Sequence, residues 1–146
     1  MNRVHFNVEE VPPLPWRGRA KAYILKVLKY LKKDAWDLSV LFCGNNRIRS
    51  LNAQYRNKDE ATDVLSFFLG ETLGGRYFPG DIAISLESLE ENAAFFKVNP
   101  DEELRRLLIH SILHLDGMDH ETNEEGEPML QLQEKILASL AGERII

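Results

Sequence analysis

Residues 110–120 read HSILHLDGMDH and contain three of the four histidines in the chain. His110 and His114 are four residues apart, a spacing that places two side chains on the same face of a helix. Gly117 can end this helix in a left-handed conformation and let the chain turn back toward it with His120. Three imidazoles with a fourth position open are typical of a catalytic zinc site, because structural zinc sites are closed by four protein ligands. We therefore predict that His110, His114 and His120 hold one Zn²⁺ ion.

The spacing of these histidines and of the glycine matches the metzincin protease pattern H-E-x-x-H-x-x-G-x-x-H at every defined position but one. At that position the chain has Ser111, where those proteases have the glutamate that acts as general base. A peptidase needs a carboxylate base beside its metal, and a serine hydroxyl is not one. The pattern therefore predicts a zinc hydrolase and argues against a protease.

Two aspartates shortly before the third histidine are candidates for the missing proton acceptor. Asp116 and Asp119 can take up a proton or hold a histidine by a hydrogen bond. The alternative interpretation is that they only form the turn around Gly117. Asp63 and Asp81 are further candidates for holding a histidine, with strand entry as their alternative role.

The segment before the histidines has the signals of a helix start. Asn99 is a good capping residue, Pro100 suits the first helical position, and residues 101–103 are acidic, as favoured at the positive end of the helix dipole. The helix that runs from there to about Gly117 is apolar on most sides, which predicts a central, buried position. Such a helix gives the metal ligands a rigid support.

The remaining periodicities predict one α+β domain over residues 1–146, with a mixed sheet of about four strands, about five helices and the histidine helix in the centre. A capping box is predicted at 122–125, an asparagine cap at residue 45 or 46, and a glycine-rich loop at 70–80. The strands are predicted at 4–8, 36–43, 64–69 and 81–85. The helices are predicted at 17–33, about 46–56, 85 or 88–97, 100–117, and after the capping box.

The net charge of −5 conceals a strong asymmetry. Residues 1–58 contain twelve Lys or Arg and four Asp or Glu, a net charge of +8, whereas residues 59–146 contain six and nineteen, a net charge of −13. A basic half indicates a polyanionic partner. Residues 17–33 alone have seven Lys or Arg and no acid. This segment is either the solvated back of a surface helix or a nucleic-acid face, and a membrane-surface helix is the weakest alternative.

Cysteine content and hydropathy indicate a compartment. Cys43 is the only cysteine, so no internal disulfide can form and a reducing environment fits. The N-terminus has no apolar signal core, and the chain has no run of about 18 apolar residues. We expect a cytoplasmic protein without a membrane partner.

Two further segments can be read together with the histidines. Residues 52–67 read NAQYRNKDEATDVLSF, and residues 80–85 read GDIAIS. With residues 110–120, in this order, they closely resemble the YbeY family of rRNA maturation factors. The resemblance spans residues 52–120, about half of the chain. It departs from the family pattern at Ser111, where the family usually has glycine, and at Met118, where it usually has tyrosine.

The resemblance implies a zinc-dependent single-strand endoribonuclease in small-subunit rRNA maturation and ribosome quality control. Its partners would be the small ribosomal subunit and its assembly factors, and no DNA is expected. The resemblance also implies that Arg56 lies near the metal. We predict Arg56 and Asp119 as catalytic residues, and Arg56, Lys58 and Arg49 as substrate-binding residues. Two alternatives stay open: a metalloprotease-like zinc hydrolase, and a non-catalytic ribosome-assembly factor that contains zinc.

Overall fold

A four-stranded mixed sheet forms the base of the protein in the computed structural model, which describes residues 1–146. β1 (Arg3–Val8), β2 (Asp37–Cys43) and β4 (Arg76–Ser85) are parallel, and β3 (Val64–Leu73) pairs antiparallel with β4 at the edge. The spatial order is β1-β2-β4-β3. The predicted mixed sheet of four strands is confirmed.

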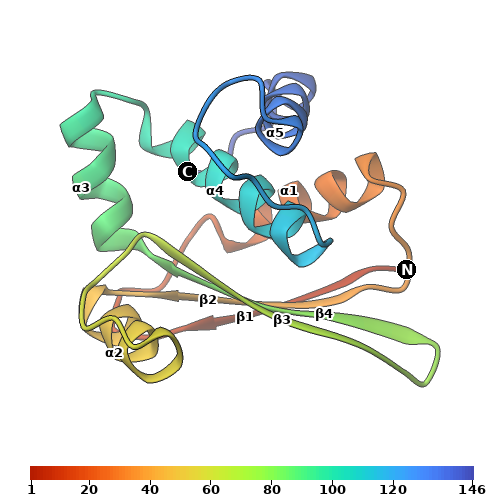
Figure 1. The fold of residues 1–146 in the computed structure, drawn as a ribbon, viewed down its shortest axis with the longest axis horizontal. Coiled ribbons are helices and arrows are strands. Elements are labelled where there is room, and N and C mark those ends of the chain that lie inside the picture. The colour runs from red at the N-terminus through yellow and green to blue at the C-terminus, as the bar shows by residue number, and fades with distance from the viewer.

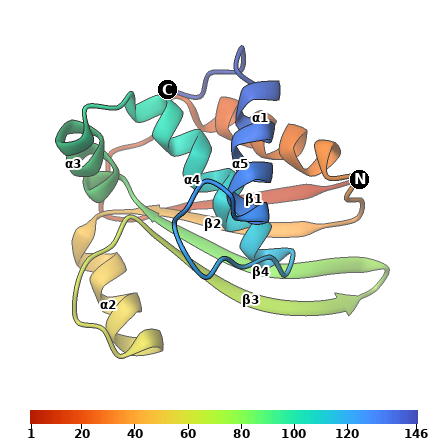
Figure 2. The same ribbon diagram turned by 45° about the horizontal axis from the view of Figure 1, so that its top comes forward.

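Five helices cover this sheet unequally. α1 (Arg17–Tyr30), α3 (Leu86–Phe96), α4 (Pro100–Leu115) and α5 (Pro128–Ser139) lie on one side, and α2 (Asn45–Arg56) lies alone on the other (Figure 1). α4 runs between the sheet and α5 (Figure 2). The predicted α+β class with the histidine helix in the centre is therefore confirmed. None of the helices combines the length and apolar character that crossing a membrane requires.

Strand alternation explains the two faces of the sheet. Leu38, Val40 and Phe42 of β2 are fully buried in the main core, which they share with α4. The opposite face is covered only where α2 packs, over a small cluster that includes Cys43 and Leu65. α2 therefore lies close to the edge strand β3, and the C-terminal end of α2 lies beside that strand.

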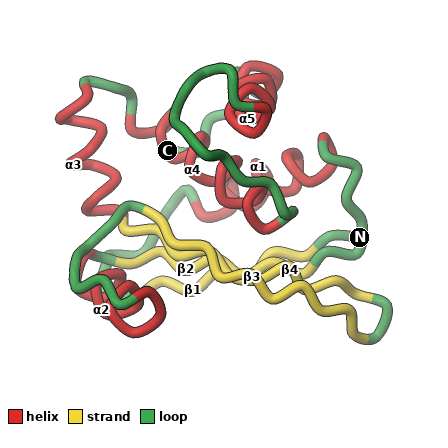
Figure 3. Tube along the Cα trace, in the orientation of Figure 1, coloured by secondary structure: helices red, strands yellow, loops and turns green.

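The predicted loop at 70–80 is wrong, because β3 and β4 continue through it as a hairpin (Figure 3). Leu73 pairs with Arg76, so only Gly74 and Gly75 form the turn. Their φ angles of 59° and 77° suit the tight turn that matches the twist of a hairpin and that glycine adopts freely. Gly70, with φ 69°, lies where the strand register shifts between Phe68 and Glu71. These three glycines shape the hairpin rather than interrupt it.

The helix starts agree with the sequence signals in one case and differ in another. Asn99 caps α4 as predicted, since its side-chain oxygen accepts from the backbone N–H of Asp101 at 2.8 Å and of Glu102 at 3.4 Å. The capping box predicted at 122–125 is wrong, because α5 begins only at Pro128. The Thr122 hydroxyl instead accepts from a backbone N–H within the preceding turn.

The asparagine cap predicted for α2 is also wrong, because Gly44 occupies the capping position. The side-chain oxygen of Asn45 instead accepts hydrogen bonds from the hydroxyls of Ser85 at 2.7 Å and Ser88 at 2.5 Å. This asparagine therefore joins the start of α2 to the start of α3. Ser85 in turn caps α3, as predicted, by accepting from the backbone N–H of Ser88.

Candidate metal centre

The three histidines meet where α4 ends. His110 and His114 lie one turn apart on α4, and the backbone N–H of Gly117 bonds the carbonyl of His114 at 3.0 Å as the helix closes. Gly117 then has a φ of 90°, the positive value that its lack of a side chain allows. The chain turns back and brings His120 to the pair, with ring centroids 4.6 to 5.8 Å apart.

The hydrogen bonds of the imidazoles fix which nitrogen of each ring is free. The Nδ1 atoms of His114 and His120 lie 3.1 and 2.7 Å from the carbonyl oxygens of Met118 and Thr122. His110 Nδ1 lies 2.6 Å from Oε1 of Gln133. Because these oxygens only accept, each Nδ1 carries a proton, and in the neutral form of each ring Nε2 keeps the free lone pair.

The free nitrogens face one another without a donor between them. Nε2 of His110 lies 3.1 Å from Nε2 of His114, and one ligand atom from each of the three histidines lies within 4.8 Å of the others. Two lone pairs at this distance repel unless a positive charge lies between them. The donor set therefore fits a metal ion bound by three neutral imidazoles, with the remaining ring nitrogens held by oxygens as in known zinc sites.

Gln133, on α5, was missed as a functional residue from the sequence. Its Nε2 donates to Glu134 at 3.1 Å, which turns its Oε1 toward His110. Glu134 in turn accepts two hydrogen bonds of 3.1 Å from Arg106 on α4. The sequence signals only that Gln133 is a polar residue among the apolar residues of its helix, and the structure shows that it is buried, with 7% of its surface exposed.

Burial lowers the pKa of His110, and the neighbouring His114 and His120 act in the same direction, while the hydrogen bond to Gln133 opposes the shift. A lowered pKa keeps the imidazole neutral at neutral pH. Neutral imidazole is the form that binds a metal. His110 is therefore ready to bind a cation without losing a proton first.

Replacing Gln133 with leucine should weaken zinc binding about 10- to 100-fold, because His110 loses the acceptor that orients its ring. Competition with a chromophoric chelator measures this affinity. Gln131→Leu, an exposed position on the same helix, is the matched control and should keep the wild-type affinity. Equal affinities for the two variants would contradict the role of Gln133.

Arg56 faces the same cavity as two of the histidines. It is the last residue of α2, its guanidinium donates to the carbonyl of Ser66 on β3 at 2.7 Å, and it lies 5.9 Å from the ring of Phe67. A cavity of about 320 Å³ is lined by Arg56, His110 and His114, together with side chains of β3. A group held at the metal ligands and a group held by Arg56 can therefore belong to one substrate.

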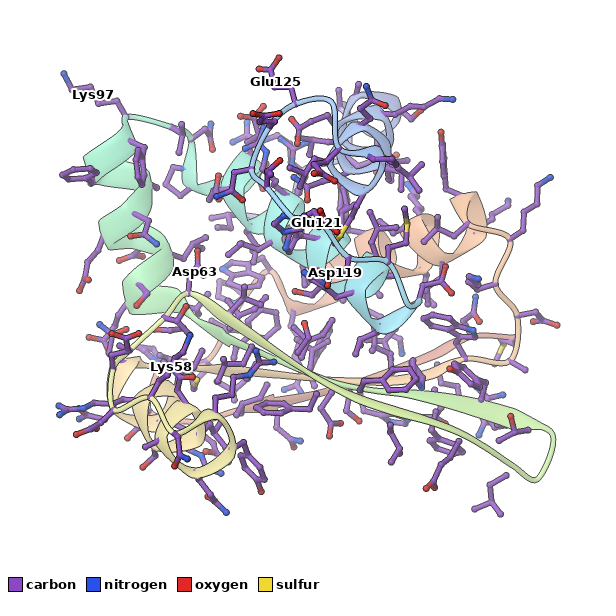
Figure 4. The ribbon with its side chains drawn as sticks, viewed as in Figure 1. Lys58, Asp63, Lys97, Asp119, Glu121 and Glu125 are labelled. Atoms are coloured by element: carbon purple, nitrogen blue, oxygen red, sulfur yellow. The ribbon has the colours of Figure 1, made fainter.

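The other predicted site residues lie around this cavity or outside it. Arg49 is exposed and donates two hydrogen bonds to the carboxylate of Asp59, at 2.8 and 3.2 Å. Lys58 is exposed on the segment between α2 and β3, without a carboxylate partner (Figure 4). Asp119 lies on the loop that follows α4, and its Oδ1 accepts from the backbone N–H of His120 at 2.8 Å.

The carboxylates considered as partners of the histidines make other contacts. Asp116 pairs with Lys33 at 2.8 Å, and Asp63 accepts from Asn92. Asp81 faces a groove on the opposite side of the sheet, and burial raises its pKa. The rings are instead oriented by Gln133 and by two main-chain carbonyls. Nor does the hydroxyl of Ser111 face the cavity, because it is fully buried and donates to the carbonyl of Leu107.

Comparison with known proteins places these residues in a family context. The family model described as Endoribonuclease YbeY matches residues 7–141. Proteins named Endoribonuclease YbeY from Treponema pallidum, Treponema denticola and a Sulfurihydrogenibium species are 46%, 48% and 40% identical to this chain. The matches cover 94%, 82% and 97% of this chain and 89%, 80% and 95% of those proteins.

The fold has a counterpart among solved structures. The solution structure of TM1509 from Thermotoga maritima superposes with a TM-score of 0.69 at 30% sequence identity. The match covers 98% of this chain and 91% of that protein. The similarity therefore extends over the sheet, the histidine helix and the helices packed on it.

Proposed function

Because the chain belongs to the endoribonuclease YbeY family, we propose that it is a metal-dependent endoribonuclease that cuts single-stranded RNA. One observation carries the proposal: two residues of the histidine cluster, His110 and His114, line one cavity together with Arg56. A cation site beside a fixed arginine suits a phosphodiester, whose negative charge increases as it is attacked.

His110, His114 and His120 would hold one Zn²⁺ ion. When bound, the ion supplies a Lewis acid beside the phosphate. Arg56 keeps one N–H on Ser66 and has other donors left for the phosphate oxygens, with which a guanidinium can form paired hydrogen bonds.

The other predicted residues serve the strand around the cut. Asp119 is exposed beside His120 and takes up the proton of the ribose 2′-hydroxyl that attacks the phosphorus. The bond from phosphorus to the 5′-oxygen of the following nucleotide breaks, and that oxygen takes a proton from water. Lys58 and Arg49 bind neighbouring phosphates. To do so, Arg49 gives up its ion pair with Asp59. These contacts hold the RNA in register without reading its bases.

The protein lacks the features that the two alternative functions, a metalloprotease and a non-catalytic zinc protein, would require. A metalloprotease requires a carboxylate at the position of Ser111, whose hydroxyl is instead bonded to its own helix. A structural zinc site requires a fourth protein ligand, and the histidine cluster has three members. A cavity at the cluster also leaves room for a substrate.

In the cell we propose that the substrate is ribosomal RNA of the small subunit, during maturation and quality control in the cytoplasm. The small subunit and its assembly factors are the proposed partners. Family membership and the basic N-terminal half support this assignment. RNA is proposed rather than DNA, and a DNA strand of the same sequence should resist cleavage.

Treatment with a chelator should abolish cleavage of a labelled single-stranded RNA, and added Zn²⁺ should restore it, because the histidines alone provide no Lewis acid. Gel electrophoresis of the products measures the reaction. Casein incubated in parallel should stay intact. Cleavage that persists after the zinc has been removed, or digestion of casein, would contradict the proposed function.

A further inference from the structure

A second basic surface lies apart from the cations of α2. A hollow of about 820 Å³ is formed by the N-terminus, β1, one side of α1 and the segment that follows α1. We call it the basic groove and define it by five cationic side chains: Arg3, Lys21, Lys29, Lys32 and Lys33. Two of the elements that line it, β1 and α1, lie close to each other near the N-terminus of the chain (Figure 2).

Most of the charge in the basic groove is not neutralised. Lys33 is the only one of its five cations with a carboxylate partner, Asp116 at 2.8 Å. Asp34 is the only acid that lines the hollow, and it pairs with the N-terminal ammonium of Met1 at 2.7 Å. By contrast, Lys26 on the same helix pairs with Glu143. Four free cations therefore gather on a protein whose net charge is −5.

The groove begins close to the metal centre. The pair formed by Lys33 and Asp116 joins it to the end of α4, only two residues beyond His114. The loop from α4 to α5 carries four glutamates, at 121, 124, 125 and 127, and two of them are labelled in Figure 4. A polyanion that leaves the metal centre is repelled by that loop and attracted to the groove.

We propose that the basic groove binds the phosphate backbone of RNA beyond the cleavage site, as a second attachment point for a longer strand. The inference rests on the proposed function in one respect, that the polyanion is RNA. Flexible lysines around an open hollow act as point charges and suit a backbone read without sequence preference. Apart from Met1, no large apolar side chain is exposed on β1 or α1, so a membrane surface lacks the apolar contacts it requires.

A triple variant tests the groove. It combines Lys21→Ala, Lys29→Ala and Lys32→Asn, where asparagine tolerates the positive φ of 58° at that position. Its control combines Lys26→Ala, Lys97→Asn and Lys135→Ala, with the same loss of charge outside the groove and an asparagine at the φ of 56° of Lys97. Circular dichroism melts and zinc content establish that both variants are folded.

Filter binding of a long single-stranded RNA at several salt concentrations gives the readout. The groove variant should bind it about tenfold more weakly, and the slope of log affinity against log salt should flatten by about 2, since each phosphate contact on a single strand contributes about 0.7. The control variant should bind as the wild type does. For the shortest RNA that the wild type cleaves, the affinity of the groove variant should fall less than it does for the long strand.

The outcomes separate the groove from the proposed function. If the groove variant binds RNA with the affinity and salt slope of the wild type, the proposed role of the basic groove is wrong. It is also wrong if the groove variant and the control variant lose affinity equally, because the loss then reflects net charge alone. If the wild type cleaves no RNA but the groove variant alone loses RNA binding, the proposed function fails and the groove stands.

Discussion

Replacing His114 with alanine should remove the bound zinc and lower the rate of RNA cleavage about a thousandfold or more. The remaining two imidazoles leave the ion under-coordinated, and loss of the ion removes several kcal/mol of charge stabilisation in the transition state. The cluster of possible ligands consists of His110, His114 and His120 alone, so no other side chain takes the place of His114. Zinc content by mass spectrometry and single-turnover cleavage measure the two effects.

His5→Ala is the matched control, because it removes the one histidine outside the cluster. His5 lies on β1 and contacts Asp37 at 2.6 Å. Its replacement should leave one zinc per chain and the wild-type rate. If His114→Ala retains a full complement of zinc, the ligand assignment is wrong. If the variant has lost its zinc and still cleaves at the wild-type rate, the metal is not part of the reaction.

The histidine cluster was predictable because its causes are local. The helical repeat places His110 above His114, and a glycine that adopts a positive φ returns the chain with His120. Only eleven residues are involved, so no knowledge of distant packing was needed. The start of α4 at Asn99 followed from equally local capping rules.

Contacts between elements were not predictable in the same way. Gln133 reaches His110 across 23 residues of sequence, and only the packing of α5 on α4 brings the two together. Asp116 lies between His114 and His120 in the sequence, yet its side chain pairs with Lys33, because α1 ends beside α4. The glycines of residues 70–80 signalled a turn but not the length of the strands that it joins, which depends on pairing between β3 and β4.

Replacing Arg56 with glutamate should lower RNA cleavage about a thousandfold and leave the zinc content intact. The guanidinium lines the cavity with His110 and His114 but bonds only to the carbonyl of Ser66, so its removal does not disturb the ligands. Loss of one well-placed donor to a transition-state oxygen typically costs 10²- to 10³-fold, and reversed charge adds repulsion of the phosphate. Single-turnover cleavage and zinc analysis on the same sample test both parts.

Two further variants separate catalysis from structure. Arg56→Lys keeps the charge and loses the paired donors, so its rate should lie between those of the wild type and the glutamate variant. Arg49→Ala, on the same helix, removes a cation that is held by Asp59 and should weaken RNA binding with little change in the rate of the bound complex. A wild-type rate for Arg56→Glu would show that RNA is positioned without this arginine. If Arg49→Ala and Arg56→Glu lower the cleavage rate equally, attraction of RNA by the positive charge of α2 explains both effects. A specific hydrogen bond from Arg56 to the reacting phosphate predicts a much larger loss at Arg56.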